Sequence, residues 1–459
     1  MSNVQRFGAS GDGVADDTDA IRHTVQYGDG MLHFPPGSYR INQPIEIPLA
    51  DSGPSGIDGT GGTARILMTG AGPAFRLIGT HNGTGDPSSV KGNVYPQQRL
   101  PTIRNIEIEG AHPAADGIQM IRTMQSVFEG VLVRRCRHGI HLTERNRNVL
   151  ISHCHIYHNS GVGIYLDQVN LHQINIASSH ISYNRLGGIR LAGSEVRNLQ
   201  ITGNDIEYNN HAQHNTAPEP TAEIYVDTTA PGASVNEIAI ASNTIQATPS
   251  PEGCNIRIRE AAGGNARPPG LWSIAGNIIG SQENNVHLTG CYGVSITGNC
   301  IYSCGNRNLL IEDSRQINVG SNTFRRHTSR MGTGVRIVRS SDIALSGCSV
   351  LDEHPEGQSS GASLLELVES QRVNVSGCQL LDGVPCGIDA TDCSHVLVTG
   401  CTISDSRPQT ISRHAVRFSG AGSGNLIGMS SLGPTVETPL SLAASAGVVA
   451  QGNVSAADR

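Results

Sequence analysis

The chain has 459 residues, a formal charge of −7, 55 glycines and only 4% aromatic residues. A core with so few aromatic rings must be filled by Ile, Leu and Val, and the many turn-forming residues favour β structure over helix. The negative charge excludes a general basic surface for nucleic acid. No stretch of about 18 apolar residues is present, so we expect no membrane span.

The first motif, FGASGDGVADDTDAI, occupies residues 7–21. Asp16, Asp17 and Thr18 predict the start of a short amphipathic helix that ends near Val25. Such a helix would cover the first coil of a solenoid, whose backbone groups are otherwise unpaired. We therefore interpret these aspartates as structural and not as catalytic.

No charged and apolar leader precedes this motif. We expect a soluble, bacterial-type protein, which is secreted if a signal peptide has been removed and cytoplasmic otherwise. The 11 cysteines are an odd number and form no CxxC pair, which argues against a disulfide framework and against a zinc ribbon.

One pattern recurs along the rest of the chain: two apolar residues that flank a variable one, two further residues, Asn, Cys or Ser, one residue, and a last apolar residue. The central apolar anchors are Val133, Ile151, Ile176, Ile201, Ile240, Ile274, Ile296, Val319, Leu345, Val375 and Val398. Each repeat also holds a second short strand, often opened by glycine, with alternating apolar and polar positions. Repeated short strands with tight corners predict an all-β fold, a single right-handed parallel β-helix of about 11–12 coils, whereas a propeller would need four longer strands per blade.

The polar position of the repeat is expected to form a ladder inside the solenoid. Amides stacked about 4.8 Å apart can bond to one another along the axis, and cysteines at the same position would behave as small buried apolar residues. The asparagines are Asn204, Asn243, Asn277, Asn299 and Asn322, and the cysteines are Cys136, Cys154, Cys348, Cys378 and Cys401.

We expect one β-helix domain over residues 1–459. Residues 1–45 would form the N-terminal cap and first strand, residues 100–428 the regular coils, and residues 429–459 a C-terminal cap or tail.

The N-terminal motif, paired with FPPGSY at 34–39, resembles the opening of the pectate-lyase-like superfamily. That superfamily includes polysaccharide lyases, alginate epimerases, polygalacturonase relatives and phage tailspikes. The resemblance implies the β-helix fold and a carbohydrate partner. The polygalacturonase residue set and the calcium-and-arginine set of typical pectate lyases are not recognisable here, so the resemblance does not fix the reaction.

The glycine-opened strand is the expected substrate face. Its outward residues are Gln119, His141, Tyr165, Arg190, Tyr225, Arg257, His287, Leu310, Arg336, Glu366, Asp389 and Arg417. Long loops at 209–220 and 259–270 single out the middle of the chain. An exposed polar sheet without a ligand would have a similar pattern, but Arg, His and Tyr suit the hydroxyls and carboxylates of sugars. The predicted substrate-binding residues are His141, Tyr165, Arg190, His211, His214, Tyr225, Arg257, Arg259, His287 and Glu312.

Two carboxylates stand out as candidate catalytic residues. Asp167 and Asp227 fall in one outward column two coils apart, roughly 9–10 Å, which approaches the separation of an inverting acid/base pair. Arg190, on the coil between them, would keep one carboxylate ionised.

An elimination would instead need a base that takes the α-proton of a uronate and a cation that neutralises its carboxylate. Candidate bases are Tyr165, Tyr225, His211 and His214, and candidate cations are Arg190 and Arg257. Both constellations use the same few residues.

A competing site lies on another face, where His155, His180 and Asp205 occupy one outward position on three successive coils. Such a set could bind a divalent metal, but a solenoid produces similar ladders without one. We expect no cofactor.

The leading hypothesis is a carbohydrate-active enzyme that cleaves glycosidic bonds of a polysaccharide or oligosaccharide, with hydrolysis slightly favoured. The alternatives are a lyase or epimerase acting on uronates, an intramolecular glycosyl transferase, or a non-catalytic carbohydrate-binding spike. The expected partner is the sugar chain, without nucleic acid or membrane, and the protein would be a monomer or a homotrimer.

Overall fold

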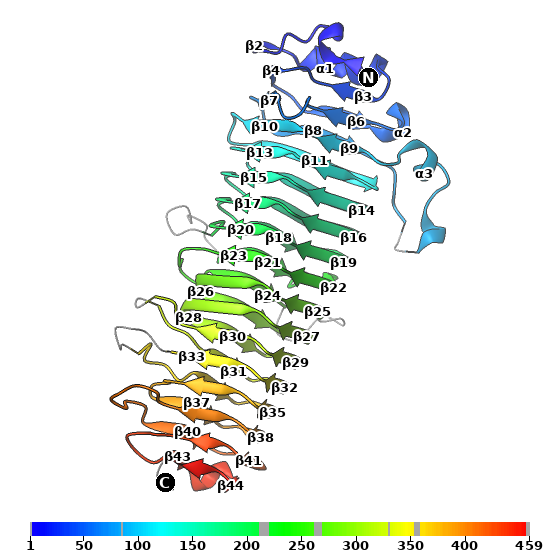
Figure 1. Cartoon of the computed structure of the whole chain (residues 1–459). Coiled ribbons are helices and arrows are strands. Elements are labelled where there is room, and N and C mark those ends of the chain that lie inside the picture. The colour runs from blue at the N-terminus through cyan, green and yellow to red at the C-terminus, as the bar shows by residue number, and fades with distance from the viewer. Residues whose placement is uncertain are drawn as a thin grey trace. The chain divides into compact units, whose positions relative to one another are not determined.

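The computed structural model describes residues 2–83, 86–210, 220–260, 269–328, 331–352 and 359–455. It divides into two compact units, Met1–Ala239 and Ile240–Arg459, and each is described by itself. In both units the chain winds through short parallel strands. Each coil contributes one strand to each of three sheets (Figure 1). The described part contains no helix with the length and apolar character that a membrane span requires.

In the first unit, the first sheet is formed by the strands that often follow a glycine, which are the second strands of the repeats in the sequence. It consists of β5 (Ile45–Pro48), β8 (Gly72–Ile78), β11 (Ala115–Met124), the start of β14 (Ile140–Ser152), the start of β16 (Ile164–Ala177), β18 (Ile189–Ala192) and β21 (Ala222–Asp227). The second sheet consists of β1 (Ser2–Asn3), β3 (Met31–His33), β6 (Gly56–Asp58), β9 (Thr102–Arg104), β12 (Val127–Glu129), the ends of β14 and β16, β19 (Glu195–Thr202) and β22 (Ser234–Ala241). The third sheet consists of β2 (Asp12–Asp16), β4 (Gly37–Ile41), β7 (Ala64–Met68), β10 (Ile106–Gly110), β13 (Leu132–Arg134), β15 (His155–Tyr157), β17 (His180–Ser182) and β20 (Asp205–Glu207).

The second unit repeats this arrangement. Its first sheet holds β24 (Cys254–Arg259), the end of β26 (Ile278–Thr289), the end of β28 (Cys300–Glu312), β31 (Val335–Val338), β34 (Leu365–Val368), β37 (Cys386–Thr391), β40 (His414–Ser419) and β43 (Leu440–Leu442). Its second sheet holds β25 (Gly270–Ala275), β27 (Tyr292–Thr297), β29 (Arg315–Gly320), β32 (Ser341–Ser346), β35 (Gln371–Ser376), β38 (Ser394–Thr399), β41 (Asn425–Gly428) and β44 (Val448–Gln451). Its third sheet holds β23 (Thr244–Gln246), the starts of β26 and β28, β30 (Thr323–Arg325), β33 (Ser349–Leu351), β36 (Gln379–Leu381), β39 (Thr402–Ser404), β42 (Ser431–Leu432) and β45 (Val454–Ser455).

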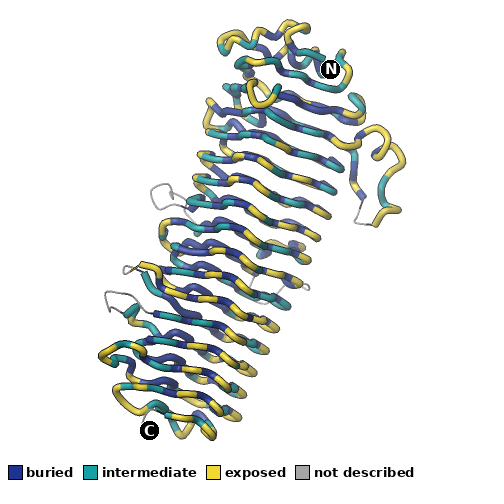
Figure 2. The backbone as a smooth tube through the Cα atoms, in the orientation of Figure 1, coloured by how far each residue is buried: buried dark blue, intermediate teal, exposed yellow. Residues whose placement is uncertain are grey.

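Successive coils pair in register, so equivalent apolar residues stack inside each unit. Buried positions recur from coil to coil along the backbone (Figure 2). On the first sheet of the first unit, Ile118 pairs with Ile140, which pairs with Ile164, and the column continues through Ile189 to Ile224. These side chains are fully buried, which is the period-2 pattern of a strand with one face inside. Coils also form over residues 31–78 and 440–455, outside the range 100–428 where the repeats are clearest.

The remaining elements are short helices. They are η1 (Val4–Phe7), α1 (Thr18–Tyr27), α2 (Leu49–Ser52), η2 (Pro87–Ser89), α3 (Val94–Gln97) and η3 (Ala444–Ala446). The predicted capping helix is present as α1, with Asp17 at its N-cap position. It ends at Tyr27, two residues beyond the predicted Val25.

The aspartates of the N-terminal motif have structural contacts, as predicted. The Asp17 carboxylate accepts hydrogen bonds from the backbone N–H groups of Ser10 and Gly11, at 2.6 and 3.1 Å, instead of capping the helix with its side chain. Asp16 accepts from the Thr18 backbone and hydroxyl. A side chain at Gly11 would meet the ring of Tyr39, which belongs to the FPPGSY segment, at 2.9 Å. This contact links the glycine of the first motif to the second motif.

The first predicted repeat is one strand out of register. Val133 pairs with Ile156 of the third sheet, whereas the residue aligned with Ile151 is Phe128. The prediction was wrong because both strands of this coil are short and apolar, and spacing alone does not separate them. Cys136 therefore does not share the position of Cys154.

The asparagine ladder is present in the second unit. Asn243 donates from its backbone and side-chain N–H groups to the Asn277 amide oxygen, at 3.0 Å each. Asn277 bonds in the same way to Asn299, and Asn299 to Asn322, at 2.9 Å. The Asn277 amide also donates to the Ile240 carbonyl at 2.9 Å. The ladder thus satisfies the backbone groups of a corner that the sheets leave unpaired.

Cysteines continue this column on later coils. The Cys348, Cys378 and Cys401 side chains are buried, and each thiol lies 3.5–3.7 Å from a backbone carbonyl of the preceding coil. A thiol thus fills the place of the amide with a weaker donor. All 11 cysteines are free, and Cys300 is the one exposed member.

We predict that Asn277→Ala lowers the free energy of unfolding by about 3 kcal/mol or more, because it leaves a buried carbonyl and two buried N–H groups without partners. Chemical denaturation would measure this, with the exposed strand residue Asn374 changed to Ala as the control. Equal stability of the two variants would contradict the role of the ladder.

We also predict that a thiol reagent modifies one cysteine, Cys300, in the folded protein and all 11 after denaturation. The other thiols are buried, so they react only when the coils open. A Cys300→Ser variant should show no rapidly reacting thiol; several fast thiols in that variant would contradict the burial of the column.

Candidate functional site

The outward column of the first sheet follows the predicted register. In the first unit, Gln119, His141, Tyr165, Arg190 and Tyr225 pair one with the next. The following outward column contains Asp167, then Ala192, then Asp227, so the two predicted catalytic carboxylates lie two coils apart in one column.

His141 and Asp167 form the central contact of this face. Nε2 of His141 lies 3.2 Å from Oδ2 of Asp167, and both side chains are partly exposed. The Tyr165 ring stacks on the His141 ring at 5.2 Å with an interplanar angle of 7°. The structure thus brings three predicted residues into one cluster that solvent can reach.

The charge state of Asp167 follows from these contacts. The hydrogen bond from His141 lowers the pKa of Asp167, with smaller contributions from Tyr165 and Gln168, and these outweigh the opposing effect of burial. Asp167 is therefore ionised at neutral pH, which suits an anion that orients or activates a neighbour and not a proton donor.

His138 adds to the cluster and was not predicted. Its ring lies 5.1 Å from the Tyr165 ring and 5.5 Å from the His141 ring. Burial lowers its pKa to about 4, so the imidazole is neutral at pH 7. It lies just before Gly139, which precedes β14, and therefore outside the alternating positions of the strand from which the outward residues were predicted.

Arg190, Tyr225 and Asp227 form a second group on the next coils. The Arg190 guanidinium lies 5.2 Å from the centre of the Tyr225 ring, and the Tyr225 hydroxyl donates to Asp227 at 3.4 Å. Tyr225 is only 2% exposed. Oδ1 of Asp227 accepts from the backbone N–H and the hydroxyl of Thr229, at 3.0 and 2.6 Å. Asp227 thus also has a structural role at the end of β21.

Glu223 is a buried acid beneath this face, and it was not predicted as a site residue. A column of Asn159, Asn184 and Asn209 ends at it, because the Asn209 amide donates to the Glu223 carboxylate at 2.5 Å. Burial raises the pKa of Glu223 to about 8, although hydrogen bonds from Asn209 and Asn210 act in the opposite direction. The available signal was a glutamate at the position where neighbouring coils have glycine.

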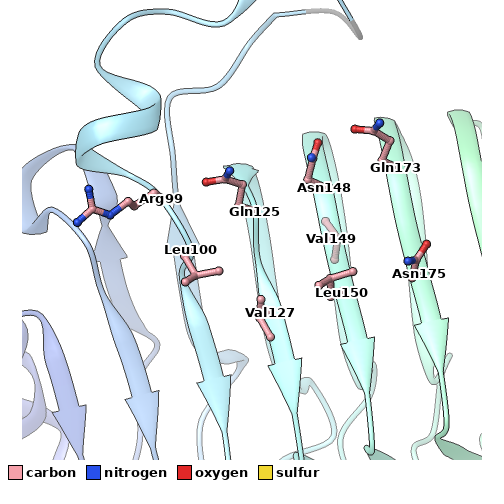
Figure 3. Close-up of a pocket in the computed structure, with 9 residues that line it drawn as sticks. All are labelled: Arg99, Leu100, Gln125, Val127, Asn148, Val149, Leu150, Gln173 and Asn175. Atoms are coloured by element: carbon pink, nitrogen blue, oxygen red, sulfur yellow. The ribbon is translucent and has the colours of Figure 1, made fainter. Parts of the chain in front are cut away.

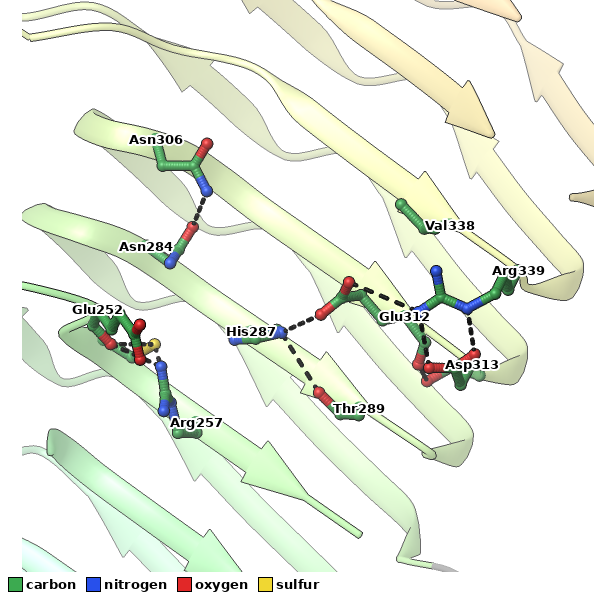
Figure 4. Close-up of polar contacts among 12 residues, drawn as sticks. Glu252, Arg257, Asn284, His287, Thr289, Asn306, Glu312, Asp313, Val338 and Arg339 are labelled. Atoms are coloured by element: carbon green, nitrogen blue, oxygen red, sulfur yellow. Dashed lines mark hydrogen bonds and ion pairs between the residues drawn. The ribbon is translucent and has the colours of Figure 1, made fainter. Parts of the chain in front are cut away.

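In the second unit, the first sheet carries a different set of polar residues (Figure 4). His287 lies 2.8 Å from Glu312 and 3.3 Å from the Thr289 hydroxyl. The hydrogen bond with His287 lowers the pKa of Glu312, and burial opposes this shift. Arg259 is exposed at the end of β24. His287 and Glu312, which were predicted separately as substrate-binding residues, are thus brought together.

Arg257 is turned toward a thiol. Its Nε donates to Cys254 Sγ at 3.2 Å, and its Nη2 donates to the Glu252 carbonyl at 2.6 Å. Burial would raise the pKa of Cys254, but His287 and Arg257 together lower it. Arg257 is buried and Cys254 is 0% exposed, so this basic group stabilises the interior of the face and is not free to bind a sugar.

Further along the second unit, the charges of the face pair with one another. Arg307 contacts Glu366 at 2.7 Å, and Arg417 binds both carboxylate oxygens of Asp389. These contacts account for the charged residues there without a ligand.

His211 and His214 lie outside the described residues. The competing metal set has His155 stacked on His180 at 5.0 Å, and His180 lies 3.2 Å from Asp205. Across the described ranges, no group of three or more His, Cys, Asp or Glu side chains is arranged to hold a metal ion.

The fold and its polar first sheet define a parallel β-helix protein. The chain belongs to the right handed beta helix family, whose model matches residues 88–245 and 284–428, more than half of the chain. A second model, described as rhamnogalacturonase A/epimerase, pectate lyase-like, matches residues 1–61 and confirms the resemblance of the N-terminal motif. No curated protein sequence matches the chain.

Several solved structures are similar to the chain at low identity. The pre-mature gene product 12 of bacteriophage phi29 is 12% identical with a TM-score of 0.52, over 98% of this chain and 73% of that chain. The Dettilon tailspike protein is 14% identical with a TM-score of 0.48, over 98% and 68%. The A-module of the Azotobacter vinelandii mannuronan C-5 epimerase AlgE4 is 14% identical with a TM-score of 0.40, over 98% and 100%. At these identities the likeness extends to the fold alone.

We predict that the stability of the protein falls as the pH rises from about 4.5 to about 8. The pKa of Glu223 is about 8 in the folded protein, above its ordinary value of 4.5, so between these values the folded state binds more protons than the unfolded state. Denaturation at several pH values would measure the slope, which Glu223→Gln should flatten and the exposed-residue control Glu237→Gln should not. An unchanged slope in Glu223→Gln would contradict this account.

Proposed function

We propose that the first sheet of the first unit is the active face of a carbohydrate-active enzyme. Its substrate would be a uronate-containing polysaccharide, and its reaction would begin with removal of the α-proton of the uronate, leading to β-elimination or epimerisation. The observation that carries this proposal is the His141–Asp167 contact, 3.2 Å long, with Tyr165 stacked on the imidazole. The pectate-lyase-like match at residues 1–61 supports the substrate class.

The proposed base is His141. With a hydrogen on Nε2 donated to the ionised Asp167, the other imidazole nitrogen has a lone pair that can accept a proton. Asp167 would orient the ring and stabilise the imidazolium that forms. This division of labour needs a carboxylate that stays charged, which is the state that the contacts of Asp167 favour.

Arg190 would neutralise the uronate carboxylate. It pairs directly with Tyr165 on the next coil and is partly exposed, so a sugar above the His141–Tyr165 stack would lie within reach of the guanidinium. Such a cation stabilises the negative charge that builds up when the α-proton leaves. Tyr165, whose hydroxyl interacts with Asp167, is the proposed proton donor to the leaving oxygen or to the opposite face of the ring.

Inverting hydrolysis by Asp167 and Asp227 is the second candidate, supported by their shared column two coils apart. In that reaction Asp167 would be the base, because its pKa is lowered. Asp227 would then have to act as the proton donor, yet its carboxylate already accepts two hydrogen bonds from Thr229 at the end of β21. The contacts therefore support proton abstraction better than hydrolysis.

We predict that uronate polysaccharides give unsaturated products or altered uronate stereochemistry, and that Asp167→Asn lowers kcat by about 10²–10⁴-fold. The amide that replaces the carboxylate would lack the negative charge with which Asp167 orients His141 and stabilises its imidazolium. Ultraviolet absorbance of unsaturated uronates and NMR of the sugar would follow the reaction.

The control is Asp205→Asn, which alters a similar His–Asp pair on the third sheet, at 3.2 Å, and should retain full activity. New reducing ends without unsaturation or epimerisation would favour hydrolysis instead. Full activity of Asp167→Asn would contradict the proposed site.

A further inference from the structure

The second sheet of the first unit carries a groove on a different face from the proposed active site. It lies beneath the segment that includes α3 and has a volume of about 510 Å³ (Figure 3). Its floor is formed by β12 and the ends of β14 and β16, and Leu100 lies beside α3 at its edge. The proposed activity uses none of its residues.

A row of amides runs along one wall of the groove. Gln125, Asn148 and Gln173 lie at the same corner of three successive coils, each with a positive φ of 54–65° that turns the side chain outward. Asn148 accepts from Arg147 at 3.2 Å. Within the described residues, the side-chain amides of Gln125 and Gln173 have no hydrogen-bond partner in the protein.

An apolar strip lies beside the amides. Val127 pairs with Leu150, and Leu150 is 45% exposed although it is a large hydrophobic residue on a strand. Leu100 occupies the Gln125 position on the preceding coil, at one end of the amide row, and is 58% exposed. The groove thus places apolar side chains beside amides that have no partner among the described residues.

This combination fits a sugar chain. Hydroxyl groups both donate and accept, as amides do, and the C–H faces of sugar rings pack on apolar side chains. Because one coil rises about 4.8 Å, the amides of Gln125 and Gln173 are roughly 10 Å apart along the axis, which suits a ligand with a regular repeat. Arg99 adds a positive charge for a carboxylate.

We propose that this groove binds an oligosaccharide segment along the coil axis, as an anchoring site that is separate from the active face. The residues that line it include no carboxylate, histidine, tyrosine or cysteine, so it binds the chain without reacting with it. The identification of the ligand as a uronate polymer rests on the proposed function. The expectation that the groove binds an extended sugar chain rests on the groove alone.

Binding to the full chain tests this proposal. Isothermal titration with polyuronate and with neutral glucan oligosaccharides would compare the Asp167→Asn protein with the same protein carrying Gln125→Ala and Gln173→Ala. We expect the double change to weaken binding of at least one polymer about tenfold. Gln200→Ala, an exposed amide in the next coil of the same sheet and outside the groove, should have no effect.

Unchanged binding of every polymer in the double variant would overturn the proposal. So would loss of self-association in that variant with sugar binding intact, which would make the groove a contact between copies of the chain. Failure of the proposed function is separable, because it appears as full turnover in Asp167→Asn, whatever the groove variants bind.

Discussion

The structure depends on one constraint. Each coil must pair in register with the next coil, at the distance of about 4.8 Å that separates neighbouring hydrogen-bonded strands. The named strands of the described residues pair in parallel, and the corners between strands would leave backbone groups without partners. Stacked side chains satisfy these groups. Asn277 shows how, because one side chain accepts from the coil before it and donates both to a carbonyl and to the coil after it.

The same constraint creates the proposed active face. Residues one coil apart are forced to neighbouring positions, so a polar residue that recurs outward becomes a column of adjacent side chains. His141, Tyr165 and Arg190 are neighbours for this reason, although 49 residues separate the first from the last. Once the fold holds these positions, burial decides the charge state of each acid. Asp167 is partly exposed and remains an anion, whereas Glu223 is buried and its pKa is raised.

Much of this could be predicted from the sequence, because period-2 patterns and recurring Asn and Cys residues report directly on which side chains face inward. The outward column from Gln119 to Tyr225 follows from that pattern alone. Val133 shows the limit, since two short apolar strands in one coil look alike until their partners are known. The contacts of individual side chains could not be predicted in the same way. Nothing in the sequence indicates that Arg257 turns toward Cys254, or that Arg417 pairs with Asp389.

The central claim is that sugar lies on the first sheet of the first unit, with its carboxylate at Arg190 and its reacting carbon at His141. The most direct measurement is a crystal structure of the Asp167→Asn protein with a bound uronate oligosaccharide. We expect a uronate carboxylate within hydrogen-bond distance of the Arg190 guanidinium and the sugar ring above the His141–Tyr165 stack. A sugar bound only at other faces of the molecule, with this sheet empty, would contradict it.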